Sequence, residues 1–582
     1  MTRMLPWRFL LVLLVVRCAC AQTISGEAVY QAQCASCHDT PASRVPPKDA
    51  LKKVAISNIL RELETGAMQS IGSRLSTAER SAVANYLGVA DKGTATAFCA
   101  DRTVSMAGGG WNGWSPEPTN TRFQSTEAAG LTVEAVGKLR LKWAFGFEGD
   151  TIVFSQPSVI GSNIFVGSNS GRVHALDAAT GCTRWMFQAD AGVRSAIVTD
   201  GKALLFGDRG GLFYSLDAAT GRLLWKKKID DHPGARTTGA AVLHEGVVYI
   251  PISSVEETLA RRDDYICCTF RGSVVALRIQ DGTQVWKTYV ITEEPKVNGK
   301  TAGPSGAGIW ATPTLDVKRG MLYAVTGDNY SDPATPMSDA VVAMDLKTGR
   351  IAWARQTIPG DVFNGGCQQK DACAGPDYDF GASVILERTE DGRELLLAGQ
   401  KSGLVYALDP DRSGAIVWQA RVGKGGVNGG VQWGMASDGK NVYAANSDVL
   451  RRTGTTYDPT QGGGLTALRI RDGERMWYAA PVACDAKPGC SPAQSAAVTA
   501  IPGVVWSGSL DGHLRAYAAE DGKVLWDFDT AREFDTVNRV QASGGGVDGP
   551  GPVIVGGRVF VGSGYARTGG MGGNVLLAFG PE

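Results

Sequence analysis

A strand pattern that ends on tryptophan recurs along most of this chain and limits what it can fold into. Each copy has one alternating strand, a turn that usually holds a glycine, and a second strand that ends on Trp. Complete copies occupy residues 171–185, 211–225, 272–286, 339–353, 403–418, 463–477 and 512–526. An eighth copy is split, with Leu139–Trp143 as one strand and Asn574–Phe579 as the other. Because pairing these two strands closes a ring without open edges, we predict an all-β eight-bladed β-propeller.

The predicted blades differ in size, and the enlarged ones carry acidic and amide side chains. Plain blades take about 40 residues, which matches the first spacings between repeat tryptophans, whereas later spacings are longer. The inserted segments include residues 253–257, 326–330, 377–379 and 399–403. Several acids with an amide and a lysine near the ring axis suit a hard cation bound by oxygen ligands. Each acid taken alone is equally consistent with a solvated loop, but their concentration in the enlarged blades favours a site.

The segment Cys34-Ala-Ser-Cys37-His38 has the spacing of a c-type haem site. Two thiols on one turn attach the haem, and the imidazole that follows takes one axial position on the iron. The alternatives are a redox pair, which prefers an α/β setting, and half of a zinc site, which needs a second ligand pair nearby. Neither context is present. We predict Met68 as the sixth ligand, the alternative being an ordinary core methionine.

The first 21 residues have the composition of a signal peptide. Arg3 and Arg8 precede a short apolar run, and Ala19 and Ala21 fit the small-residue cleavage rule. Two cysteines in the same stretch leave a lipoprotein as an alternative. No other segment reaches the roughly eighteen apolar residues of a membrane span. We therefore expect an exported, periplasmic protein without a membrane span.

The remaining chain divides into two predicted domains. Residues 22–92 fit a small all-α cytochrome c domain, because helical patterns surround the haem motif. Residues 93–110 have the composition of a linker, and residues 111–582 hold the propeller. Lys+Arg and Asp+Glu are equal at 58 each, so nucleic-acid binding has no electrostatic support.

Export allows the cysteines to oxidise. Removing the haem pair from the predicted mature chain leaves an even number, and two of the resulting pairs lie six residues apart in polar loops. The predicted disulfides are Cys99–Cys182, Cys267–Cys268, Cys367–Cys373 and Cys484–Cys490.

Several of these features together resemble a known family. Residues 111–124 with the run Asn120-Thr-Arg-Phe, residues 136–143, the Trp-ending repeats and the adjacent cysteines are similar to the pyrroloquinoline quinone (PQQ) dehydrogenases. That resemblance implies an eight-bladed propeller that holds the quinone and Ca²⁺ on its axis. The leading cytochrome c domain, residues 267–273 and the ending 563–579 are most similar to the branch that oxidises polyvinyl alcohol.

The resemblance also assigns roles to residues of the enlarged blades. It implies Asp377 as the catalytic base, although the cysteine insertion before it leaves Asp379 open, and Lys401 as the cation at the quinone carbonyls. The implied calcium ligands are Asp377, Glu257 or its neighbour Glu256, and Asp328 or its neighbour Asn329.

Further positions match groups that hold the quinone. Arg194 and Thr238 match residues that bind its carboxylates, Trp310 matches the indole stacked under its ring, and Trp506 is a weaker match. Whether the Cys267–Cys268 pair lies over the quinone stays open, because it falls in a later blade than in the methanol-oxidising members.

The implied function is an alcohol dehydrogenase. Hydride passes from the carbinol carbon to PQQ, and the haem then passes electrons singly to an external cytochrome or other acceptor. A polymeric alcohol is the implied substrate, with small primary alcohols, sugars or aldehydes as alternatives. A different class, a non-catalytic propeller scaffold that binds partner proteins, has no need of the haem or the clustered acids.

Overall fold

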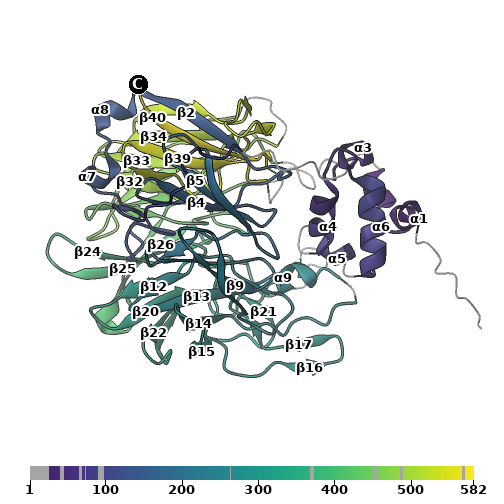
Figure 1. The fold of residues 1–582 in the computed structure, drawn as a ribbon. Helices are drawn as coiled ribbons and strands as arrows, with labels where there is room; N and C mark the ends of the chain where they lie inside the picture. Colours follow the sequence, from purple (N-terminus) through teal and green to yellow (C-terminus); the bar gives the residue numbers. More distant parts are fainter. Residues whose placement is uncertain are drawn as a thin grey trace, which may run out of the picture.

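The computed structural model describes residues 25–39, 45–64, 68–72, 74–89, 97–262, 264–367, 373–450, 457–484, 489–566 and 570–582. The predicted signal peptide lies outside these residues. Within them, no helix combines the length and the apolar character that a membrane crossing requires. Two parts are visible, a small helical domain and a large ring of sheets beside it (Figure 1).

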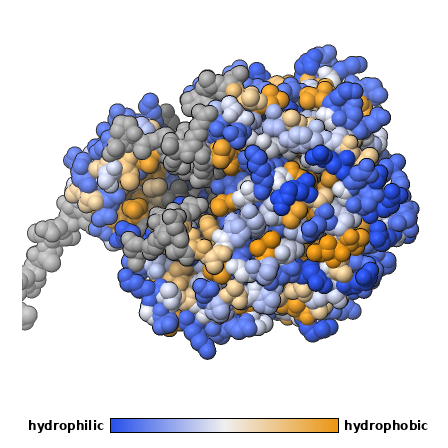
Figure 2. Space-filling view, turned by 180° about the vertical axis from the view of Figure 1, so that it is seen from behind, coloured by the Kyte–Doolittle hydropathy of each residue, from blue (hydrophilic) through white to orange (hydrophobic). Residues whose placement is uncertain are grey.

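The helical domain contains α1 (Gly26–Gln33), α2 (Ala35–His38), α3 (Lys48–Leu51), α4 (Ile56–Glu64), α5 (Gln69–Gly72) and α6 (Thr77–Leu87). Ser76 and Glu79 form a capping box that starts α6, since each side chain accepts the backbone N–H of the other residue. The core of this domain is apolar and includes Tyr30, Ile59 and Val83. Seen from behind, the domain is a separate lobe against the propeller (Figure 2).

The described residues form eight antiparallel sheets around the ring, six of four strands and two of five, which confirms the predicted eight-bladed propeller. The first four are β3 (Ser158–Ile160), β4 (Asn163–Gly167), β5 (Arg172–Asp177) and β6 (Thr183–Gln188); β7 (Val198–Thr199), β8 (Ala203–Gly207), β9 (Leu212–Asp217) and β10 (Leu223–Lys228); β12 (Val242–His244), β13 (Val247–Ser254), β14 (Ser273–Arg278) and β15 (Gln284–Tyr289); β19 (Thr314–Asp316), β20 (Met321–Val325), β22 (Ala340–Asp345) and β23 (Ile351–Gln356).

The other four sheets complete the ring. They are β24 (Ile385–Arg388), β25 (Glu394–Gly399), β26 (Leu404–Asp409) and β27 (Ala415–Arg421); β28 (Ala436–Ser437), β29 (Asn441–Ala445), β30 (Leu465–Arg469) and β31 (Arg475–Ala479); β32 (Thr499–Ile501), β33 (Val504–Gly508), β34 (His513–Ala518) and β35 (Val524–Asp529); β38 (Val553–Val555), β39 (Arg558–Ser563), β40 (Val575–Pro581) and β2 (Leu139–Gly146).

Short elements are added to these sheets. Strand β1 (Gly110–Trp111) pairs with β3, and β11 (Ala235–Arg236) pairs with β13. Three further pairs are β16 (Lys296–Asn298) with β17 (Thr301–Gly303), β18 (Ser305–Gly306) with β21 (Asn329–Ser331) and β36 (Glu533–Phe534) with β37 (Ala542–Ser543), and the short helices are α7 (Thr126–Ala129), α8 (Val133–Val136), α9 (Glu256–Leu259) and η1 (Pro410–Arg412).

The ring closes as the split repeat predicts. Strand β2 pairs antiparallel with β40, so that Leu139 lies opposite Pro581 and Gly146 opposite Val575. The last sheet therefore takes three strands from the end of the chain and one from its first part. This pairing removes the open edge that an unclosed row of sheets would leave.

The repeat tryptophans join neighbouring sheets. Trp185, on the last strand of its sheet, donates its indole N–H to the carbonyl of Ala218 in the next sheet at 3.2 Å. Its ring covers Gly221, where a Cβ would lie 2.5 Å from a ring carbon, and Gly221 has a φ of 71°. Glycine is needed there for both reasons. Trp526 makes the corresponding contact across the ring closure, to the carbonyl of Leu139 at 3.2 Å.

One segment follows the first strands around one end of the ring. The backbone carbonyls of Pro118, Thr119, Thr121 and Arg122 accept N–H groups from four successive first strands, β19, β24, β28 and β32. The Arg122 side chain is fully buried and donates to the carbonyls of Trp114 and Val498 and to the side chains of Gln156 and Thr499. The segment with the Asn120-Thr-Arg-Phe run therefore ties the inner strands together at one end of the axis.

The four predicted disulfides are confirmed. Cys99–Cys182 ties the predicted linker to the first sheet, where Thr183 also exchanges backbone hydrogen bonds with Ala97 and Cys99. Cys34 and Cys37 are free, as a haem attachment requires.

We predict that Gly221→Ala destabilises the propeller more than Gly246→Ala. Both glycines have positive φ, 71° and 77°, so each substitution carries a backbone strain of about 1 kcal/mol. Only Gly221 lies against a tryptophan ring, whereas a Cβ at Gly246 meets nothing within 4 Å. Displacing Trp185 should cost roughly a further 1–3 kcal/mol. Denaturant unfolding midpoints measure the difference, and equal midpoints would contradict the role of the Trp–Gly contact.

Candidate active site and haem site

The haem motif lies where two short helices meet, with Cys34 between α1 and α2 and its other residues on α2. Cys34 and His38 are buried and Cys37 is exposed. The His38 Nδ1 lies 2.7 Å from the carbonyl of Pro46. If Nδ1 carries the proton and donates it to this carbonyl, Nε2 is left unprotonated, which is the form of imidazole that binds a metal. This hydrogen bond is compatible with the expected role of His38 as an axial ligand.

Met68 belongs to the same domain core. Its side chain is partly buried and packs against the cluster that holds Cys34 and Tyr30. Its backbone N–H donates to the carbonyl of Glu62 at 3.0 Å, which fixes the start of α5 after α4. Met68 thus packs against the same apolar core as Cys34.

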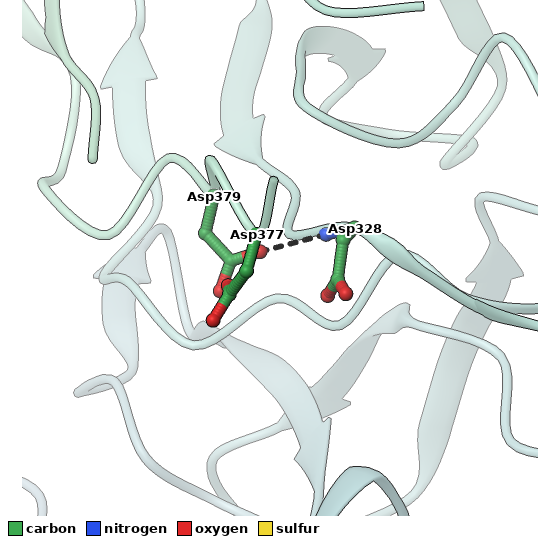
Figure 3. A group of neighbouring side chains, drawn as sticks. All are labelled: Asp328, Asp377 and Asp379. Atoms are coloured by element: carbon green, nitrogen blue, oxygen red, sulfur yellow. Dashed lines mark hydrogen bonds between the residues drawn. The ribbon is translucent and has the colours of Figure 1, made fainter. Parts of the chain in front are cut away.

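Three aspartates meet in the propeller near the axis (Figure 3). Asp328 lies between β20 and β21, and Asp377 and Asp379 precede β24. One carboxylate oxygen from each lies within 4.8 Å of the others, and all three side chains are buried. Asp377 has a φ of 60°, an uncommon conformation for a residue with a Cβ that is typically kept at functional sites.

Lys401 and Trp310 complete this group. The Lys401 ammonium lies 2.5 Å from Asp377 Oδ1 and 3.1 Å from Asp379 Oδ2. The Trp310 indole N–H donates to Asp379 Oδ2 at 3.1 Å, and the backbone N–H of Asp328 donates to Asp379 Oδ1 at 2.7 Å. Among the described residues, the Asp379 carboxylate therefore accepts from Trp310, Lys401 and the Asp328 N–H, whereas the Asp377 carboxylate accepts from Lys401.

The surroundings shift the pKa values of the three aspartates in different directions. Burial raises the pKa of Asp377, opposed by the charge of Lys401, and burial with the charges of Asp379 and Asp377 raises the pKa of Asp328. Burial also acts on Asp379, but Lys401 and the Asp328 N–H outweigh it and lower the pKa of Asp379. The neighbouring acids raise the pKa of Lys401 despite its burial. The group thus has more acids than cations in a dry setting, which favours a bound cation.

The alternative calcium ligands differ in their partners. The Glu256 carboxylate accepts the backbone N–H groups of Thr269 and Phe270 and the hydroxyl of Tyr265, so it holds the chain after α9 in place. Asn329 is occupied similarly, since its side chain accepts from the Thr335 N–H and donates to the Ser305 carbonyl.

The adjacent residues Asp328 and Glu257 are better placed for a calcium ion than Asn329 and Glu256. Asp328 Oδ2 is buried and has no hydrogen-bond partner among the described residues. Glu257 is close enough to Asp328, Asp377 and Lys401 to affect the pKa of each.

A cavity adjoins this group. Its lining includes Arg194, Thr238 and Trp310, which the sequence comparison assigned to quinone binding, and it extends to Gln156 and Ser383 at the first strands of two sheets. The structure brings these three predicted residues together.

Aromatic rings surround Arg194 in this cavity. Its guanidinium lies 5.2 Å from the Phe154 ring centroid and 4.9 Å from that of Trp433, and it donates to the Tyr565 hydroxyl at 3.0 Å. Trp310 and Trp433 meet edge to face with centroids 5.2 Å apart. One fixed cation beside flat aromatic faces suits a planar, anionic ligand.

Sequence reasoning missed Trp114 and Trp433, which also line the cavity. A usable signal was present, because both lie outside the Trp-ending repeat, as Trp310 does. Trp506 also lies outside it, but the structure does not bring Trp506 to the cavity. Its side chain is fully buried between sheets, in a cluster with Trp526 and Phe579.

The Cys267–Cys268 pair is likewise not part of the cavity lining. Cys268 is buried in a core cluster with Phe270 and Tyr330, and the segment pairs with β17 through Ala302. Phe270 stacks on Tyr330, which follows Asp328 and Asn329 in the chain. The disulfide thus supports the wall that carries the acids.

Comparison with known proteins adds independent information. One family model, described as cytochrome C oxidase, cbb3-type, subunit III, matches residues 21–87, and another, described as outer membrane protein assembly factor BamB, matches residues 132–372. The fold is similar to the crystal structure of quinohemoprotein alcohol dehydrogenase from Comamonas testosteroni, with a TM-score of 0.59, 18% identity, and coverage of 81% of this chain and 80% of that chain.

Two relatives match along nearly the whole chain. A polyvinylalcohol dehydrogenase of Pseudomonas sp is 40% identical over 95% of this chain and 93% of the relative. A polyvinylalcohol dehydrogenase of Sphingopyxis sp. (strain 113P3) is 38% identical over 96% of this chain and 93% of the relative.

We predict that Met68→Ala leaves the haem attached and changes its axial ligation. Attachment depends on Cys34 and Cys37, whereas the thioether of Met68 is the expected sixth ligand. The methionine-to-iron charge-transfer band of the oxidised protein should disappear. An unchanged spectrum would assign the sixth position to another residue.

Proposed function

Because this chain belongs to the polyvinyl alcohol dehydrogenase family of PQQ-dependent quinohaemoprotein alcohol dehydrogenases, we propose that it oxidises the secondary alcohol groups of polyvinyl alcohol to ketones. The chain is an enzyme with a cytochrome c-type domain, so the alternative of a non-catalytic scaffold does not apply. The observation that carries the proposal is the buried group of Asp377, Asp379 and Lys401 beside the Trp310 indole.

The chain offers matching groups for both cofactors of the propeller. Asp328 and Asp377, with Glu257 beside them, would hold Ca²⁺, and the unpartnered Asp328 Oδ2 fits this role because a buried carboxylate oxygen without a donor needs a cation or a proton. The cavity with Arg194, Thr238 and Trp310 would hold PQQ. Glu256, Asn329 and Trp506 are not part of this proposal, because each has the structural role described above.

When bound, Ca²⁺ and PQQ supply a Lewis acid and a two-electron acceptor. The residues of the chain supply the proton chemistry. A carboxylate oxygen of Asp377 accepts the proton of the alcohol hydroxyl, and burial makes this carboxylate a stronger base than an exposed one. The charge of the Lys401 ammonium opposes the rise in the pKa of Asp377, and the contact between the two groups orients the carboxylate before the alcohol arrives.

The burial of the site also serves the reaction. Asp377, Asp379 and Lys401 are each less than 10% exposed, so the charges act on one another with little screening by water. Asp379 holds Trp310 and Lys401 in position through their hydrogen bonds and does not itself contact the alcohol.

The remaining parts of the proposal concern location and electron flow. We propose that residues 1–21 direct export to the periplasm and are removed, and that 22–92, 93–110 and 111–582 are the limits of the cytochrome domain, linker and propeller. His38 and Met68 would ligate the haem iron, with the haem bound to Cys34 and Cys37. An external cytochrome or another acceptor takes the electrons from the haem.

Catalysis by Asp377 predicts a sharp difference between two similar substitutions. Asp377→Asn should keep the fold and the haem but lower alcohol-dependent turnover by roughly two to four orders of magnitude, the range for loss of a general base. Asp379→Asn should be much milder, because its role is to accept hydrogen bonds from Trp310 and Asp328. Steady-state kinetics of both Ca²⁺- and PQQ-loaded variants provide the measurement. The reverse order of effects would make Asp379 the base.

The substrate is tested with a panel of alcohols. The loaded enzyme should reduce its haem with polyvinyl alcohol and with small secondary alcohols such as 2,4-pentanediol, which share the reacting group. Activity confined to small primary alcohols, sugars or aldehydes would contradict the polymeric substrate while leaving the enzyme class intact.

A further inference from the structure

The helix α4 has one face in the core of its own domain and another toward the propeller. Ile59 and Leu63 are buried in the helical core. Asn58 and Glu62, each one residue earlier, are four residues apart and so lie one turn apart on a neighbouring face. Asn58 is only 8% exposed, although it does not belong to that apolar core. Something outside the helical domain therefore covers it, and Figure 1 shows α4 on the side that faces the propeller.

Asn58 and Glu62 both contact the first part of the propeller. The Asn58 side chain donates to the carbonyl of Gly149 at 3.0 Å, in the connection between β2 and β3. The Asn169 side chain, between β4 and β5, donates to Glu62 Oε1 at 3.2 Å. In each contact a side-chain amide N–H donates to an oxygen, the carbonyl of Gly149 in one and the carboxylate of Glu62 in the other.

The contact at Glu62 continues into the cavity. Arg209 donates to the Asn169 side-chain oxygen at 2.8 Å, and its guanidinium lies 5.7 Å from the Phe154 ring centroid. Arg194 approaches the same ring at 5.2 Å. Because Phe154 and Arg194 line the cavity, only Arg209 and Asn169 separate that wall from the helical domain along this route.

The contact at Glu62 also continues toward the haem motif. The carbonyl of Glu62 accepts the backbone N–H of Met68 at 3.0 Å. A single residue therefore holds the propeller with its side chain and the proposed iron ligand with its backbone.

We infer that the Asn58–Glu62 face of α4 is the docking surface that fixes the haem domain beside the cofactor cavity, through Gly149 and the Asn169–Arg209 pair. Oxidation of one alcohol group to a ketone releases two electrons and two protons, and the haem accepts the electrons one at a time. Two transfers to the haem per turnover therefore depend on a fixed separation between the domains. This inference rests on the proposed function, which supplies the electrons.

The first test introduces a repulsion between like charges at the Glu62 contact and then removes it. Asn169→Asp keeps the size of the side chain and its oxygen for Arg209, but it places a carboxylate against the Glu62 carboxylate. Repulsion should lower the docked population and slow alcohol-driven haem reduction by about tenfold in a stopped-flow experiment. Adding Glu62→Gln removes the like charge and supplies a new donor, so the double variant should recover the original rate.

The second test acts on the other contact. Gly149→Ala adds a Cβ that would lie 1.7 Å from the Asn58 side-chain nitrogen, whereas Gly246→Ala has a similar φ and no neighbour within 4 Å. Haem reduction should slow in the first variant and stay unchanged in the second. Turnover with a small dye as acceptor should be unchanged in all of these variants, because the dye takes electrons without the haem domain.

The outcomes separate the inference from the proposed function. Absence of dye-linked turnover in the unaltered holoenzyme with every alcohol would overturn the proposed function. Normal dye-linked turnover, with haem reduction unaffected by Asn169→Asp and by Gly149→Ala, would overturn the docking surface. Slow haem reduction that Glu62→Gln does not restore would also overturn it, since the effect would then arise elsewhere.

Discussion

The pairing of β2 with β40 is the contact on which the rest of the propeller depends. It joins a strand near residue 140 to the last strand of the chain, so every sheet has a neighbour on both sides. The first strands then face a shared axis, and loops that are far apart in the sequence converge there. Asp328 and the pair Asp377 and Lys401 come from two consecutive sheets and meet where those sheets pack together. The cavity beside them is lined by segments from sheets all around the ring, so its geometry depends on the whole ring.

The repeat allowed the architecture to be predicted from sequence, because its period and its tryptophans recur in a regular way. The contact from Trp185 to Gly221 explains why both residue types recur: the ring needs a surface without a Cβ in the next sheet. The path of residues 118–122 along the first strands was not predictable, because its contacts use backbone carbonyls and one buried arginine without a periodic pattern. The hydrogen-bond partners of these carbonyls and of Arg122 lie on strands that come beside the segment only in the folded ring.

The site was predictable to the extent that single residues carry its chemistry. The acids and Lys401 interrupt otherwise regular repeats, so their positions were visible in the sequence. The choice between neighbours was not, because Glu256 and Glu257 differ in their partners and not in their chemistry. For Trp506, the local sequence pattern was a better guide than the family resemblance. It lies within the apolar strand β33, where alternation places it between sheets, and the resemblance outweighed that local signal.

The two domains are joined by weaker forces than those that close the ring. A net hydrogen bond contributes about 1 kcal/mol, and one to a charged group roughly 1.5–3 kcal/mol, so the contacts at Gly149 and Glu62 hold the haem domain with only modest energy. The Cys99–Cys182 disulfide strengthens docking indirectly. It fixes the chain to the same sheet that bears Asn169, leaving only the short stretch after Leu87 as the tether. A shorter tether raises the effective concentration of the haem domain at its docking surface. The disulfide thereby makes a small interface sufficient for the proposed docking.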